Sequence, residues 1–83
     1  MSFAARNVTT SSSVIIEPNG ARSVYVVQNP PGSGQTVYIQ EGQAATATSA
    51  SLALAAGDSY TGRGGAAVHA IATGSVSVTI KEY

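Results

Sequence analysis

The 83-residue chain contains no cysteine, no tryptophan, one phenylalanine and one histidine. The absence of cysteine excludes disulfide bonds and thiolate metal sites, and a lone histidine, His69, argues against a dedicated metal site. Four basic and four acidic residues cancel, and they make up 10% of the chain, against about 25% in an ordinary soluble domain. Such a surface provides no broad electrostatic field for nucleic acid or an anionic membrane. We therefore expect no cofactor, no metal, no nucleic-acid partner and no membrane partner.

Long apolar runs are also missing. No stretch approaches the ~20 apolar residues that a helix needs to span a bilayer. The chain begins with methionine, and the segment around Phe3 is too short and too polar for a secretory signal. We expect the protein to be made in a cytoplasm, as a complete gene product.

The small size of the chain predicts one domain that associates. A single domain is the default at this length, and so short a chain buries a modest fraction of its surface on folding. Small domains compensate with disulfide bonds, metal ions or oligomerisation. The composition excludes the first and disfavours the second, so a homo-oligomer is expected.

Short runs of β-branched and alternating residues are separated by turn signals. Pro18-Asn19-Gly20, Ala56-Gly57-Asp58 and Thr73-Gly74 are typical of turns. The runs cover residues 14–16, 23–28, 36–41, 59–61, 66–72 and 75–81. Five to seven short strands of this kind predict an all-β fold, a small antiparallel β-sandwich or barrel. Residues 14–83 form this single domain in our interpretation.

Two segments lack a bulky apolar pattern. Residues 1–13 are small and polar, which is typical of an arm or a weak edge strand; we expect a flexible arm that orders only against a neighbour. Residues 43–56 are rich in alanine, serine and threonine. Alanine favours helix, but no helical stripe of bulky residues exists to dock one, so extended chain is expected, with a helix as the alternative.

The similar segments VYVVQ (residues 24–28) and VYIQE (residues 37–41) flank the segment NPPGSGQT. This arrangement suggests an antiparallel hairpin of two like strands. In that hairpin Tyr25 lies opposite Tyr38. Alternation then sorts the side chains into two faces. The predicted core face consists of Val24, Val26, Val37 and Ile39, and the other face consists of Tyr25, Val27, Thr36, Tyr38 and Gln40.

No residue pattern indicates catalysis. His69 has no nearby acidic residue in the sequence, the four carboxylates lie in separate segments, and no serine or threonine is in a nucleophile-elbow context. Arg63-Gly64-Gly65 matches a motif that RNA-binding tails repeat. Those tails are repetitive and basic, whereas this is one copy in a neutral chain, so a glycine-rich hairpin loop is the preferred interpretation. We therefore expect a protein that is not an enzyme.

Tyrosine supplies contact area at low entropic cost and is enriched at interfaces. Ordinary core packing against a second sheet is the alternative for Tyr25 and Tyr38. The residues expected at a protein interface are Phe3, Arg6, Tyr25, Val27, Tyr38, Tyr60 and Arg63.

From Asn29-Pro30 onward the order of short motifs resembles a known group of proteins. Val37-Tyr38-Ile39, the segment Leu54-Ala55-Ala56-Gly57-Asp58, the strand from Val68 to Ala72 and a closing Val-x-Val strand are similar to those of small β-sandwich virion proteins of tailed bacteriophages. Gln40 stands where that group commonly has glycine, and His69 where it has an aromatic residue.

This resemblance implies a structural virion protein. It suggests a capsid decoration or cement protein that binds the major capsid protein on the exterior of the assembled head, and stabilises it. The alternative is a receptor- or carbohydrate-binding module of a tail or fibre. Because capsid lattices offer three-fold sites, a trimer ranks ahead of a dimer.

Overall fold

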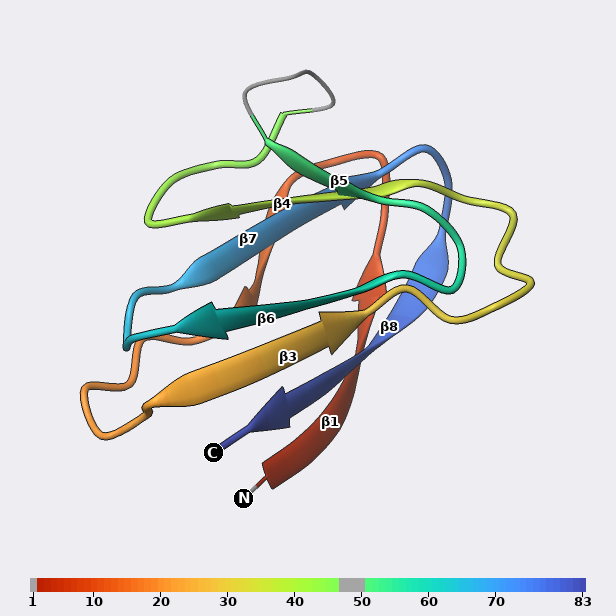
Figure 1. Ribbon diagram of the computed structural model, residues 1–83. Helices are drawn as coiled ribbons and strands as arrows, with labels where there is room; N and C mark the ends of the chain where they lie inside the picture. Colours follow the sequence, from red (N-terminus) through yellow and green to blue (C-terminus); the bar gives the residue numbers. More distant parts are fainter. Residues whose placement is uncertain (1, 47–50) are drawn as a thin grey trace.

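A computed structural model describes residues 2–46 and 51–83 of the chain, with residues 2 and 3 described by their backbone alone. The described residues form eight short strands and no helix (Figure 1). The strands are β1 (Ser2–Val8), β2 (Ser13–Ile16), β3 (Val24–Gln28), β4 (Val37–Glu41), β5 (Leu52–Leu54), β6 (Ser59–Arg63), β7 (Val68–Ala72) and β8 (Val76–Glu82).

The strands form two four-stranded antiparallel sheets that pack as a sandwich. One sheet has the order β1-β8-β3-β6 and the other β2-β7-β4-β5. The pairs β1–β8, β2–β7, β3–β6 and β4–β5 are nested, so that each pair encloses the next along the chain. Eight strands wound in this way form a jelly roll. The predicted small all-β sandwich is confirmed.

The predicted hairpin between β3 and β4 is wrong, because the two strands lie in different sheets. Residues 29–36 cross from one sheet to the other, and the buried side chain of Asn29 fixes this crossing. Its Nδ2 donates to the carbonyls of Gln35 at 2.7 Å and Leu54 at 2.9 Å, and its Oδ1 accepts from Ser33 Oγ at 2.9 Å. The Asn29 backbone also exchanges hydrogen bonds with the turn at residues 57–58.

The predicted faces are correct for β4 and reversed for β3. Val37 and Ile39 are buried as expected, whereas Tyr25 and Val27 point into the core and Val24 and Val26 lie on the outer surface, partly buried. Both alternating sets of β3 are apolar, so alternation alone cannot assign its inner face.

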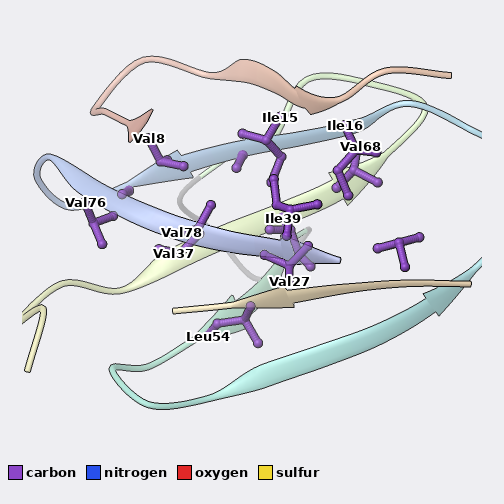
Figure 2. Close-up of a cluster of buried hydrophobic side chains, with 14 residues drawn as sticks. Val8, Ile15, Ile16, Val27, Val37, Ile39, Leu54, Val68, Val76 and Val78 are labelled. Atoms are coloured by element: carbon purple, nitrogen blue, oxygen red, sulfur yellow. The ribbon is translucent and has the colours of Figure 1, made fainter. Parts of the chain in front are cut away.

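The core fills the space between the sheets (Figure 2). The alternations predicted for β7 and β8 are confirmed: alternate residues from Val68 to Ala72 and from Val76 to Ile80 are buried. The buried apolar side chains that form the cluster are Val8, Ile15, Ile16, Tyr25, Val27, Val37, Ile39, Leu54, Val68, Ala70, Ala72, Val76, Val78 and Ile80.

The N-terminal segment is not the expected arm. Strand β1 pairs with β8 along its whole length, from Ser2 opposite Glu82 to Val8 opposite Val76. Val8 is fully buried in the core. The edge-strand interpretation is therefore the correct one, and the domain begins before residue 13. Figure 1 shows the two termini close together at one end of the sandwich.

Extended chain was expected for residues 43–56, and the structure places the short strand β5 there; residues 47–50 lie outside the described residues. The turn expected at residues 56–58 is present: Gly57 has a φ of 89°, in the left-handed region, and Asp58 N donates to Ala55 O at 2.9 Å. In the part of the chain that the structure describes, no helix is long and apolar enough to cross a membrane.

Candidate functional site

The outer surface of the sheet β2-β7-β4-β5 carries neighbouring side chains that include no aspartate, glutamate, lysine or arginine. Tyr38 on β4 lies between Ile71 on β7 and Ala53 on β5, and Val14 on β2 lies opposite His69 on β7. We call these five residues the uncharged face. Val14 is 40% exposed, and Tyr38, His69 and Ile71 are half-buried.

The opposite sheet has a different outer surface. There Val24 pairs with Arg63 and Val26 with Lys81, so basic side chains flank the apolar residues of β3. Contiguous surface patches rich in apolar side chains mark contacts with other proteins. Of the two outer surfaces, the uncharged face is the one that can meet another protein without removing a charge from water.

Tyr25 joins the two sheets at one end of the sandwich. Its side chain is 1% exposed, and its hydroxyl donates to the Glu41 carboxylate at the end of β4. Burial, followed by the hydrogen bond and charge of Glu41, raises the pKa of Tyr25 well above its usual value. The phenol therefore stays protonated and remains the donor of this bond.

The ring of Tyr25 is held by three neighbours. Gly62, its partner on β6, lacks a side chain, and a Cβ there would lie 2.2 Å from the Tyr25 ring. The Tyr60 ring is tilted against it with centroids 6.2 Å apart. The Arg22 guanidinium lies 5.3 Å from the Tyr25 centroid, within the range of a cation–π interaction.

Arg22 is itself buried and binds backbone carbonyls. Its Nε donates to Gly64 O at 2.9 Å, and its two terminal nitrogens donate to the carbonyls of Glu17 and Ala66. The guanidinium thus links Glu17, which precedes it closely in the chain, to Gly64 and Ala66, which lie far along the chain. Buried arginines of this kind have a structural role, because a planar fork of donors matches several fixed acceptors.

A cleft of about 140 Å³ lies beside this cluster. It is lined by residues of both sheets: Tyr25, Ile39, Gln40, Glu41, Leu52, Tyr60 and Val68. The edge strands β5 and β6 contribute Leu52 and Tyr60, and Leu52 is 44% exposed. The cleft therefore combines an apolar wall, two tyrosines, one amide and one carboxylate.

The structure distributes the seven expected interface residues over the whole molecule. Tyr25 and Val27 are buried, so the prediction that they form an exposed contact surface is wrong, and the core alternative holds for Tyr25. Tyr38 is central to the uncharged face, and Tyr60 lines the cleft. Arg63 is exposed on the other sheet, and the side chain of Phe3 lies outside the described part of the structure.

Arg6 is exposed on the edge strand β1, opposite the buried Val78. Its position is therefore on the inner side of the sheet, at the open edge. Charged residues that point inward on edge strands prevent unwanted strand pairing, which is an explanation for Arg6 that needs no partner.

The sequence interpretation missed Arg22, Glu41 and Gly62. Each acquires its role through a residue far away in the sequence, and none belongs to a recognisable motif. Within the described ranges, no three His, Asp or Glu side chains are close enough to hold a metal ion together.

No known protein-family model matches the chain, and no curated protein matches it. It is similar to a solved structure from work that describes Bacillus endospore appendages as a novel family of disulfide-linked pili, with 18% identity and a TM-score of 0.49 over 95% of this chain and 80% of that chain. At this level the likeness identifies neither a family nor a function. The present chain, which lacks cysteine, cannot itself form disulfide links.

Proposed function

We propose that the protein is a structural virion protein that decorates the exterior of a phage head and binds assembled coat subunits through the uncharged face. The observation that carries this proposal is the position of Tyr38 between Ile71 and Ala53 on an outer sheet surface without charge. Tyrosine in an apolar setting is a frequent anchor of protein interfaces. The jelly-roll topology adds an analogy, since viral capsid domains use it, although fold alone does not determine function.

The motifs behind the phage resemblance have structural roles in this fold. Asn29 binds the Leu54 carbonyl and the backbone of residues 57–58, and Val37 lies between Leu54 and Ala72. These residues build the sandwich, so proteins with different partners can share them. The partner contacts of a decoration protein must therefore come from the outer surfaces, where the uncharged face is the candidate.

The proposed partners are the major capsid protein and other copies of this chain, with a trimer preferred over a dimer. The face contains no aspartate, glutamate, lysine or arginine, so covering it does not require desolvation of a permanently charged group. Long-range attraction to a charged coat surface is correspondingly absent. Binding to the head should then depend weakly on salt, which separates this proposal from electrostatic docking through Arg63 and Lys81.

The experiment replaces both central residues of the face, Tyr38→Ala with Ile71→Ala, and uses Val24→Ala with Val26→Ala as the control on the other sheet. Purified protein is mixed with expanded empty capsids of the phage that encodes it, and bound copies are counted after sedimentation. Loss of one interfacial tyrosine typically costs ~2 kcal/mol or more, or about 30-fold in affinity. We expect a folded Tyr38/Ile71 variant with at least this loss, and a control that binds normally.

Two results would contradict the proposal. The first is wild-type protein that does not bind these capsids at any stage of expansion. The second is a folded Tyr38/Ile71 variant that binds as well as the wild type, which would assign the contact to another surface. Sedimentation velocity of both variants tests self-association separately.

A further inference from the structure

The cleft between the two sheets has the composition of a binding site for an amphipathic cation. Leu52, Ile39 and Val68 form its apolar lining, and the half-buried Tyr60 adds an aromatic ring. Glu41 is the charged residue among those that line it. Ligand pockets typically combine an apolar lining with few fixed polar groups that orient the ligand.

The Glu41 carboxylate is fixed in place but not neutralised. It accepts a hydrogen bond from Tyr25 on the opposite sheet, which restrains its position. Arg22, the cation beside the Tyr25 ring, donates to three backbone carbonyls instead. Among the described residues, no basic side chain forms an ion pair with Glu41. The carboxylate thus retains acceptor capacity beyond the one bond from Tyr25.

We infer that this cleft binds an alkylammonium group. The ammonium would bind the Glu41 carboxylate, and the methylene groups would pack against Leu52 and the apolar floor. The Tyr60 ring adds a cation–π contribution, for which tyrosine is suited. A ligand of this kind matches both the apolar lining and the carboxylate of the cleft. Flexible alkyl chains with a charged end can cover apolar surface while the charged end keeps a polar partner.

Other ligand classes fit less well. An anion would meet the uncompensated charge of Glu41. A purely apolar ligand would take water from that carboxylate without replacing its hydrogen bonds, which is unfavourable. A sugar ring could hydrogen-bond to the carboxylate and to the Gln40 amide, but it would leave the charge of Glu41 without a counter-charge. The inference does not depend on the proposed capsid role.

The chemistry is shared by two sources, a free small amine and a lysine side chain of another protein. Both present three N–H donors on an alkyl chain. The free amine requires space only for itself, whereas a lysine requires the cleft mouth to admit a peptide backbone. A small amine and a lysine-containing peptide, used as separate probes, therefore distinguish the two sources.

The test is a titration of the isotope-labelled protein followed by the amide shifts of Glu41, Leu52 and Tyr60 in NMR spectra. The probes are n-butylammonium chloride, n-butanol as its neutral counterpart, and glucose, all at constant ionic strength set with sodium chloride. We expect saturable shifts with butylammonium, at least tenfold weaker binding of butanol, and no saturable binding of glucose. Equal binding of butylammonium and butanol, tighter binding of glucose, or no saturation by any probe would overturn the inference.

Variants locate the binding group. Glu41→Gln keeps an oxygen that can accept from Tyr25 but removes the charge, and it should abolish the preference for butylammonium over butanol. Glu17→Gln is the matched control, because it removes the same charge from an exposed side chain outside the cleft lining. Tyr60→Leu should weaken butylammonium binding roughly two- to fivefold, while Tyr60→Phe keeps the ring and the affinity. Equal effects of the two glutamate changes would contradict the site.

A short peptide, Gly-Gly-Lys-Gly-Gly with blocked ends, separates the two sources. Binding of the peptide as tight as that of butylammonium supports a lysine side chain as the ligand. Binding of butylammonium without the peptide supports a free amine. Both results support an alkylammonium site, and failure of both probes excludes one.

Discussion

The close contact between Gly62 and Tyr25 makes a sharp prediction for Gly62→Ala. A Cβ at position 62 would lie 2.2 Å from the Tyr25 ring and would have to move beyond 3.4 Å to reach an ordinary van der Waals contact. The ring is 1% exposed and has Arg22 over it. It therefore cannot move without disturbing the core or its bond to Glu41.

The expected cost follows from two opposing effects. Alanine restricts the unfolded chain more than glycine and would by itself stabilise a strand position by ~0.5–1 kcal/mol. Overpacking a filled core costs ~1–3 kcal/mol, occasionally more, and the lost hydrogen bond to Glu41 adds ~1.5 kcal/mol or more, because the acceptor is charged. We expect a net destabilisation of about 2–4 kcal/mol, which for a domain of this size lowers Tm by roughly 10–25 °C.

Urea unfolding followed by circular dichroism measures this change, with Gly20→Ala as the control. Gly20 has no atom within 4 Å of its added Cβ and no positive φ, so alanine there should change the stability by less than about 0.5 kcal/mol. The double variant Tyr25→Leu with Gly62→Ala should be less destabilised than the two single changes added together, because the leucine leaves room for the Cβ. A Gly62→Ala protein as stable as the Gly20→Ala control would refute the packing of Tyr25 on Gly62.

Three further predictions concern the same framework. Folding raises the pKa of Tyr25, so above the ordinary tyrosine pKa of about 10 the unfolded state loses this proton before the folded state does. Above that pH the wild type should therefore lose up to ~1.4 kcal/mol of stability per pH unit more than Tyr25→Phe. Urea unfolding of both proteins between pH 8 and 11 measures this difference. Asn29→Ala leaves buried carbonyls without donors and should cost at least ~2 kcal/mol, against almost nothing for the exposed Asn7→Ala. Deleting residues 2–8 removes the buried Val8 and one of the two partner strands of β8, so the truncated chain should be unfolded at room temperature or show a much lower Tm. Retention of the wild-type Tm would contradict the paired position of β1.

The alternation of apolar and polar residues predicted the inner face of those strands in which only one set of alternate residues is apolar. In β8, Val76 and Val78 alternate with serine and threonine, and the inner face is evident from the sequence alone. In β3 both sets are apolar, and the choice depends on Gly62, which lies in another strand 37 positions along the chain. Local alternation carries no information about such a partner.

The pairing of the strands was the second feature that the sequence alone did not predict. Neighbouring strands in a sequence often pair, but Asn29 closes a crossing between sheets by binding the carbonyl of Leu54, 25 residues away. The uncharged face and the cleft follow from the same topology, because they unite residues of different strands. The sequence singled out Tyr38 and Tyr60 as contact residues, but only the fold assigns one to a sheet surface and the other to a cleft.

The nested strand order has a consequence for the route by which the chain folds. The β4–β5 pair joins segments close together in the sequence, and β1–β8 joins the two ends. Each inner pair, once formed, shortens the loop that the next pair must close, and closure entropy grows with loop length. Assembly from the innermost pair outward is therefore the least costly order. During synthesis, β1 leaves the ribosome first yet acquires its partner β8 last, so its apolar residues remain exposed for nearly the whole time that the chain is being made.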